Sequence, residues 1–259
     1  MKLFFLISIS LLNMSIFFAQ ENNLCGEINY TQVINITSVF EQKFSLKFTN
    51  KQSLYEEINI KSTNDKTNKS TSEKGLTNTI IVGRANKISN FFYNEINNFY
   101  FRHVFLNEVL LVKEDMFKWV WDLQPETKTI GTFVCQKATI KFRGRNYIAW
   151  FTNEIPVPFG PWKFQGLSGL ILEVYDEAKE FHIYTDNIKI ENKVCTIDID
   201  KNQFIKTLNI DEYLLKKEEL LNDYFVKLAS KAPKGVKPAK YDKNCEDCPK
   251  PLELFDEKN

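Results

Sequence analysis

Apolar and polar side chains alternate along most of the chain between residues 28 and 199. In the segment 43–48, Phe44, Leu46 and Phe48 alternate with polar residues, which is typical of a strand with one buried face. The same pattern predicts further short strands at 28–33, 54–60, 79–82, 90–93, 99–105, 109–113, 118–123, 133–142, 146–152, 170–175, 181–185, 188–190 and 193–199. Gly144 separates two of these strands, 133–142 and 146–152, so they are expected to form a hairpin.

Residues 211–230 break the alternation. Leu214, Leu221 and Phe225 recur at helical spacing, either Asn209 or Asp211 can cap the start, and a proline follows the end at position 233. The sequence therefore predicts a mainly β fold. It consists of a single curved antiparallel sheet or partly open barrel, with one C-terminal amphipathic helix packed on it.

The first twenty residues have the pattern of a targeting segment. Lys2 precedes the almost wholly apolar run 3–12, and the chain turns polar at Gln20. We interpret residues 1–20 as a secretory signal peptide cleaved between about Ala19 and Glu21, the alternatives being a buried strand or a membrane anchor. Export to the periplasm or the medium is expected. No other stretch is long and apolar enough to span a bilayer, so no transmembrane segment is expected in the mature chain.

Composition divides the rest of the chain and limits its partners. A β-rich domain is expected over 21–230, followed by a polar tail rich in Lys and Pro over 231–259. The 34 basic and 33 acidic residues nearly cancel, which argues against a nucleic-acid partner. Two histidines leave little material for a metal site, and neither a metal nor a cofactor is expected. The 22 Phe, 10 Tyr and 4 Trp exceed what a small core needs and favour an apolar ligand cavity.

Five cysteines follow the predicted leader, so in an oxidising compartment at most two bridges form and one thiol is left over. Cys245 and Cys248 have CxxC spacing in the polar tail, where a local disulfide is the expected structure. Among the other three, the pairing we favour is Cys25 with Cys135, although sequence does not fix connectivity.

A loop rich in proline and aromatic residues precedes the strand at 170. The prolines at 156, 158 and 161 make it rigid, and Phe159, Trp162, Phe164 and Leu167 give it apolar surface. One interpretation is a structural crossover that plugs the sheet. The other is that these four side chains form the rim of a ligand pocket.

This loop and the strands before it resemble the GLPGLI family of exported proteins, known mainly from Bacteroidota and without an established activity. The family's signature is matched as Gly166-Leu167-Ser168-Gly169-Leu170-Ile171, and its Cys-Gln-Lys-Ala strand as 135–138. Its FRGR turn corresponds to 142–145 and its AWFT strand to 149–152, within a dense match from about Trp119 to Asp176. The resemblance implies export but supplies no catalytic residues.

Few residues suggest chemistry. Ser168 replaces the signature's proline, but Leu170 stands where a nucleophile elbow needs glycine. His182, with Asp186 on the same strand face and Cys135 elsewhere, could form a Cys–His site. Arg143 and Arg145 could clamp a carboxylate or phosphate, or form a solvated hairpin tip.

No nucleophile, base and orienting group come together in this pattern, so no catalytic residue is assigned. We expect an exported, non-catalytic binding or accessory protein for an apolar, peptide or cofactor-like ligand or an outer-membrane partner. The alternative is a hydrolase of unrecognised type.

Overall fold

The computed structural model describes residues 24–36, 38–58, 88–95, 98–232 and 251–255. The predicted leader, the expected strand at 79–82 and the Cys245–Cys248 pair lie outside these residues. None of the helices described is long and apolar enough to cross a membrane.

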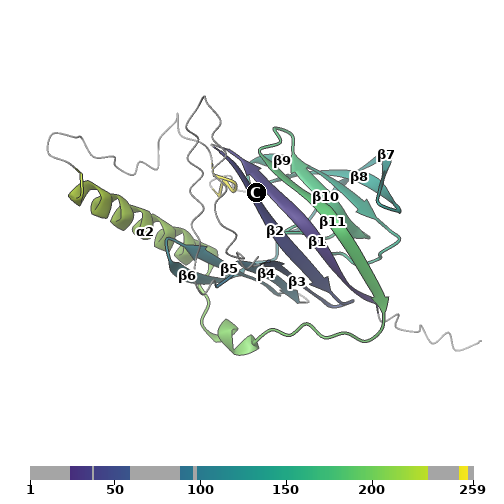
Figure 1. The fold of residues 1–259 in the computed structure, drawn as a ribbon, viewed down its shortest axis with the longest axis horizontal. Helices are drawn as coiled ribbons and strands as arrows, with labels where there is room; N and C mark the ends of the chain where they lie inside the picture. Colours follow the sequence, from purple (N-terminus) through teal and green to yellow (C-terminus); the bar gives the residue numbers. More distant parts are fainter. Residues whose placement is uncertain (1–23, 37, 59–87, 96–97, 233–250, 256–259) are drawn as a thin grey trace, which may run out of the picture.

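Eleven strands form one antiparallel sheet (Figure 1). They are β1 (Leu24–Asn35), β2 (Val39–Phe48), β3 (Gln52–Glu57), β4 (Phe91–Glu95), β5 (Asn98–Phe105), β6 (Glu108–Glu114), β7 (Asp122–Ile130), β8 (Phe133–Phe142), β9 (Arg145–Thr152), β10 (Leu170–Asp176) and β11 (Phe181–Asn192). Their order is β6-β5-β4-β3-β2-β1-β11-β10-β9-β8-β7. The two halves of the chain therefore join where β1 pairs with β11.

The sheet has to curve strongly because its two edges are neighbours in the chain. The edge strands are β6 and β7, and only residues 115–121 connect them. A flat sheet of this many strands would be about 48 Å wide, whereas such a link spans at most about 30 Å. Curvature brings the edges close enough, and the prediction of a single curved antiparallel sheet is confirmed.

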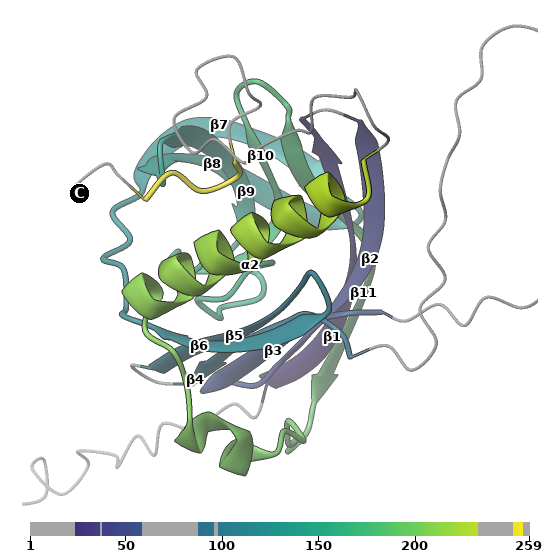
Figure 2. The same cartoon turned by 90° about the vertical axis from the view of Figure 1, so that its left-hand side faces the viewer.

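The predicted C-terminal helix is confirmed as α2 (Ile210–Ser230). Asn209 caps it, because its side chain accepts a hydrogen bond from the backbone N–H of Glu212, whose carboxylate accepts one from the backbone N–H of Asn209. Figure 2 shows α2 lying across the open side of the curved sheet. Tyr213 is its one buried residue, and its ring packs edge-on against Phe101 of β5.

The core lies on the concave face and is unusually aromatic. Phe44 stacks on Tyr55, and Tyr55 meets Tyr30 edge-on, which joins β2, β3 and β1. On another side of β4 and β5, the short helix η2 (Lys201–Ile205) stacks Phe204 on Tyr93 and Tyr100. These strands are thus held by packing beyond the main core.

Two expected strands are wrong. Residues 118–121 are not a strand; β7 instead begins at Asp122 and runs to Ile130 through Pro125, which an edge strand tolerates. Residues 193–199 are irregular. β11 itself continues to Asn192, which pairs with the first residue of β1, Leu24, so β1 has no further residue with which 193–199 could pair.

Candidate functional site

The loop between β9 and β10 folds into the concave face as a plug. Phe159, Trp162, Phe164 and Leu167, the candidate pocket rim, are all buried within the main core. The Trp162 ring meets Phe92, Phe142 and Phe181, from β4, β8 and β11, with centroids 5.2–6.4 Å away. This placement matches the crossover interpretation. A role of the four side chains in ligand binding stays a prediction.

The structure explains why the GLPGLI-type signature has a glycine at position 169. A Cβ there would lie 2.0 Å from the carbonyl oxygen of Thr152, so only glycine lets the chain turn this tightly into β10. Ser168 is exposed, and its hydroxyl donates a hydrogen bond to Asn153 Oδ1 at 2.7 Å. No base contacts it among the described residues.

Lys163 is the one charged side chain carried inward by this plug. Trp162 has φ +56°, a left-handed conformation rare for a bulky residue. The next residue, Lys163, is 4% exposed. Its ammonium lies 4.5 Å from the centre of the Phe101 ring. Such an ammonium needs close anionic partners to remain charged without water.

Two carboxylates supply those partners. Lys163 Nζ lies 2.7 Å from Glu114 Oε2 and 2.8 Å from Glu253 Oε1, while Arg143 Nη2 donates to Glu114 Oε1 at 2.9 Å. Burial acts to lower the pKa of Lys163, but Glu253 and Glu114 outweigh it and hold that pKa above its ordinary value. We call Glu114, Arg143, Lys163 and Glu253 the interior ion cluster.

The fourth member of the interior ion cluster comes from a separate piece of chain, the segment 251–255. This segment lies on the open side of the sheet together with α2 (Figure 2, yellow). The backbone N–H of Leu254 donates to the carbonyl of Arg143 at 3.1 Å, and Leu252 packs against the main core. The segment thus docks on the β8–β9 turn.

Helix α2 closes the same region from another side. The Tyr213 hydroxyl lies 2.8 Å from His103 Nδ1 of β5. Burial lowers the pKa of His103 to about 4, with Lys217 and Lys163 acting in the same direction. Burial also lowers the pKa of Lys217; the Glu253 carboxylate opposes this and the Lys163 ammonium reinforces it. His103 is therefore neutral near pH 7, and Lys217 lies close enough to Lys163 and Glu253 for their charges to interact.

Little empty space remains inside the sheet at this point. The cavity beside Phe99, Phe142 and Lys163 holds about 10 Å³. The plug thus fills the expected apolar cavity. The segment 251–255 lies beside it on Arg143, Arg145 and Lys163, and we call this place the mouth of the concave face.

The two arginines of the β8–β9 turn bind carboxylates of the chain itself. Arg145 Nη1 contacts Asp176 Oδ2 at 2.7 Å and Glu180 Oε2 at 2.6 Å, and Arg143 contacts Glu114. Their side chains are only 10% and 19% exposed, so the turn is not a solvated tip. Binding of an external anion stays a prediction.

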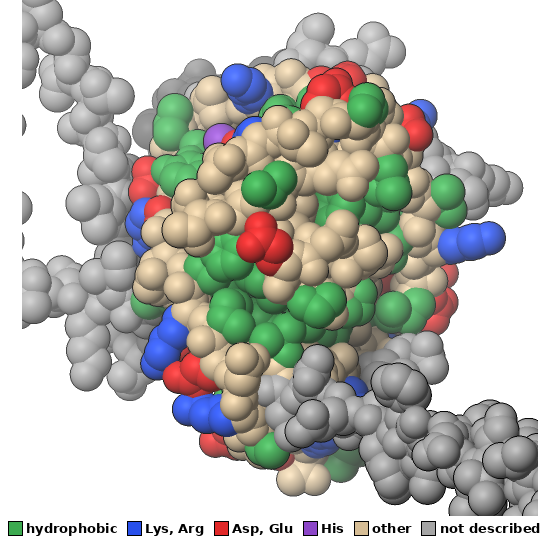
Figure 3. All heavy atoms as spheres, turned by 90° about the vertical axis from the view of Figure 1, so that its right-hand side faces the viewer, with side chains coloured by type: hydrophobic (Ala, Val, Ile, Leu, Met, Phe, Trp, Pro, Cys, Tyr) green, Lys and Arg blue, Asp and Glu red, His purple; other side chains and the backbone are tan. Residues whose placement is uncertain are grey.

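The outer face of the sheet carries a second polar group. Figure 3 views the side opposite Figure 2 and shows apolar side chains gathered over its middle. His182 Nε2 lies 2.9 Å from Glu173 Oε1, whose carboxylate also contacts Lys128. Partial burial acts to raise the pKa of Glu173, but hydrogen bonds from His182 and Lys128 hold it below its ordinary value. Asp186 is not part of this group; it binds Thr31 and Lys43.

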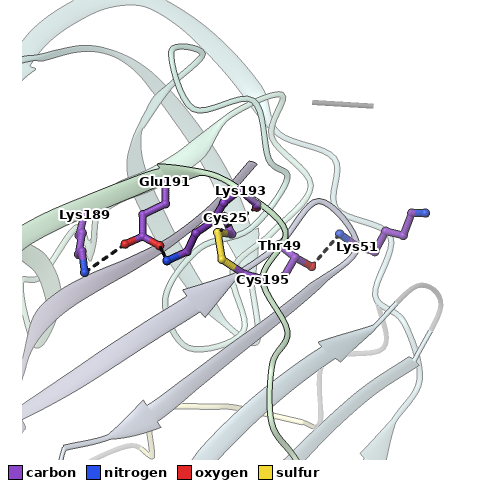
Figure 4. Close-up of a disulfide and its surroundings, with 7 residues drawn as sticks. All are labelled: Cys25, Thr49, Lys51, Lys189, Glu191, Lys193 and Cys195. Carbon is purple, nitrogen blue, oxygen red and sulfur yellow. Dashed lines mark hydrogen bonds and ion pairs between the residues drawn. A yellow bond between two sulfur atoms is a disulfide. The ribbon is translucent and has the colours of Figure 1, made fainter. Parts of the chain in front are cut away.

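The expected Cys25–Cys135 bridge is wrong. Cys25 pairs with Cys195, with Cα atoms 6.1 Å apart (Figure 4), and Cys135 is a buried free thiol. Burial raises the pKa of Cys135 to about 11, although Lys128 opposes this, so the thiol is a poor nucleophile. A disulfide is typical of extracytoplasmic proteins.

A groove of about 410 Å³ runs beside this disulfide. Its lining is mixed and includes Thr49, Gln52, Val194, Cys195 and Lys201. Glu191 stands between Lys189 and Lys193 at the side of the disulfide (Figure 4). The two sulfurs and the Glu191 carboxylate lie within 4.8 Å of one another, but a disulfide offers no thiolate to a metal.

Sequence reasoning missed the interior ion cluster. Its members lie at the end of β6, in the β8–β9 turn, in the plug and near the chain's last residues, so no local pattern unites them. One signal was available: Lys163 is flanked by Trp162 and Phe164 in an otherwise apolar loop.

A short part of the chain matches a family model. A family model described as "Protein of unknown function (Porph_ging)" matches residues 143–173, which include the GLPGLI-type signature. None of the curated proteins matches the sequence.

The solved structures that match this chain include the following three. PNGF-II, in its P21 and C2 crystal forms, is 15% identical with TM-scores of 0.51 and 0.48, over 77% and 76% of this chain. The match covers 34% and 32% of the PNGF-II chains, so this chain spans about a third of them. The LolA superfamily protein NE2245 from Nitrosomonas europaea is 7% identical with a TM-score of 0.27, over 72% of this chain and 91% of that one. The likeness to PNGF-II in the P21 form concerns the fold alone.

Proposed function

We propose that this protein is an exported, non-catalytic binding or accessory protein. Its ligand site is the mouth of the concave face, beneath α2, and its ligand combines a carboxylate with apolar groups. One observation carries the proposal. The buried ammonium of Lys163 forms an ion pair with the carboxylate of Glu253, which belongs to a separate segment of the chain.

Charge supports a site for an added anion. Without Glu253, the cluster would hold Lys163 and Arg143 against the single carboxylate of Glu114, and Lys217 adds a nearby cation. A buried site with excess positive charge favours an anionic group strongly, because low polarity strengthens the attraction. Aromatic rings at the same place, Phe101 and Trp162, favour apolar groups beside that anion.

The hydrolase alternative receives no support from the described residues. Cys135 is buried with a raised pKa, and Ser168 bonds to an amide rather than to a base. His103 bonds to Tyr213 and His182 to Glu173, and neither contacts a nucleophile.

Native mass spectrometry of the protein purified from its export compartment tests the proposal. We expect an added mass on the wild type that is lost in Lys163→Met/Glu114→Gln, a pair that removes one charge of each sign. A wild type without any bound species, or an equal amount in the double variant, would contradict the proposal. The matched control is Lys216→Met/Glu219→Gln, which alters an exposed ion pair on α2.

A further inference from the structure

The segment 251–255 is held in the way that proteins hold extended peptides. Backbone groups are used at two points: Leu254 N–H donates to the Arg143 carbonyl at 3.1 Å, and Arg145 Nη2 donates to the Pro251 carbonyl at 3.4 Å. A side chain between them, Glu253, reaches Lys163. Main-chain bonds combined with side-chain sites at fixed spacing are the usual basis of peptide recognition.

The apolar side chains of the segment also have dedicated partners. The Phe255 ring lies 4.3 Å from the guanidinium of Arg143, a cation–π contact. Leu254 lies against Gly144, where an added Cβ would come within 2.6 Å of its Cδ1. A side chain at Gly144 would therefore push against the segment.

Lys163 and Arg143 have an ionic partner other than Glu253. Glu114 binds Lys163 and Arg143 at 2.7 and 2.9 Å, so both cations retain a partner when Glu253 leaves. The segment itself is partly buried: Pro251 is exposed, Leu252, Leu254 and Phe255 are half-buried, and the Glu253 side chain is the most enclosed part, at 15% exposed. A short, partly exposed segment opens at low free-energy cost compared with the sheet.

We infer that the mouth of the concave face binds an extended peptide of a partner protein, with an acidic residue flanked by apolar ones. Residues 251–255 are an intramolecular occupant of the same chemistry. This rests on the proposed function and names its ligand class. The attached segment competes at the high effective concentration that tethering gives, so a partner peptide binds by displacing it.

Fluorescence anisotropy with a labelled peptide of residues 250–256 tests the inference on full-length chains. In the Glu253→Lys variant, the introduced ammonium faces Lys163 and Arg143, so the attached segment leaves. We expect this variant to bind the peptide about tenfold or more tightly than the wild type does. A peptide carrying Gln in place of its Glu should bind about tenfold more weakly. The matched control is Glu108→Lys, which reverses the charge of an exposed residue on β6 and should bind the peptide as the wild type does.

Hydrogen exchange of the wild type supplies an independent measurement. Excess peptide should speed exchange of the Leu254 amide. Equal peptide binding by wild type and Glu253→Lys, insensitivity to the Glu-to-Gln change, or an unchanged Leu254 amide at saturation would each overturn the inference. Dimers in which the segment of one copy fills the site of another would overturn the assignment to a separate partner. A retained ligand that is not a peptide would overturn it too, while supporting the proposed function.

Discussion

Lys163 and Glu114 join the two halves of the sheet. Glu114 ends the edge strand β6, Lys163 belongs to the plug between β9 and β10, and Nζ lies 2.7 Å from Oε2. The pair thus crosses the concave face and ties the N-terminal half of the sheet to the C-terminal half.

The effects of removing Lys163 and Glu114 on stability should not be additive. Lys163→Met and Glu114→Gln should each lower the free energy of unfolding by about 1.5–3 kcal/mol, because the remaining buried charge loses one of its two ionic partners. The double variant should lose clearly less than the sum. Urea unfolding at pH 7 measures the cycle, and strictly additive losses would show that the two charges are not coupled. The exposed Lys216→Met should leave the stability nearly unchanged.

Two turn glycines offer a matched test of how the segment 251–255 docks. Gly131 and Gly144 both have positive φ, +60° and +77°, but an added Cβ meets nothing at Gly131 and meets Leu254 at Gly144. Gly131→Ala should cost about 1–2 kcal/mol from backbone strain. Gly144→Ala should cost about 1–3 kcal/mol more, from crowding. Leu254→Ala should reduce the difference in thermal or urea unfolding, because it removes Cδ1 and Cγ but keeps the Cβ that would lie 2.9 Å from the added carbon. Equal losses in the two single variants would argue against a docked segment in solution.

Stability should fall in mild acid because of His103. Its folded pKa is about 4, whereas an unfolded histidine titrates near 6.5. As the pH falls from about 6.5 to 4, the His103 side chain becomes protonated in the unfolded chain while it stays largely neutral in the folded chain. Folding therefore weakens across this window, by about 2–3 kcal/mol from this group. His103→Gln should flatten that part of the profile, measured as urea midpoints at pH 7 and pH 4.5. An unchanged slope would mean that His103 is solvated.

The disulfide should be visible chemically and energetically. Non-reducing peptide mapping should link Cys25 to Cys195, and iodoacetamide should label Cys135 only after unfolding, because that thiol is buried with a pKa of about 11. Cys195→Ser should cost about 2–5 kcal/mol. A peptide joining Cys25 to Cys135 would refute this connectivity.

Trp162 should behave as a core residue with a strained backbone. It is 6% exposed, so Trp162→Ala should cost about 3–5 kcal/mol. Its φ of +56° suits glycine better than alanine, so Trp162→Gly should be no less stable than Trp162→Ala. Phe40→Ala, at a 54% exposed position, is the control and should change unfolding by about 0.5 kcal/mol or less. Loss of peptide binding beyond this destabilisation would point to a binding role for Trp162.

Local patterns predicted the regular elements well where burial was one-sided. The strand through Phe44, Leu46 and Phe48 and the helix capped at Asn209 follow from side-chain period and capping chemistry. The strand β7 was missed because it is an edge strand exposed along most of its length, so no alternation marks it.

Long-range features were beyond local patterns. The partner of Cys25 depends on the pairing of β1 with β11, which places Cys25 opposite Glu191 and lets the following residues return to it. The interior ion cluster depends on the same closure and on the docking of the segment 251–255. Both require the three-dimensional arrangement of residues far apart in the chain.

The place of β1 in the sheet sets the order in which the chain can fold during synthesis. Its neighbour β2 follows immediately, but β11 is the last strand made. Until then β1 presents an unpaired edge, with Ile28 and Tyr30 ready to pair with any other strand. Closure is therefore a late, long-range and slow event, during which the nascent chain is vulnerable to aggregation. Cys25 lies on β1 and Cys195 follows β11. Formation of the disulfide between them therefore shows that these two strands have come together and that the sheet is complete.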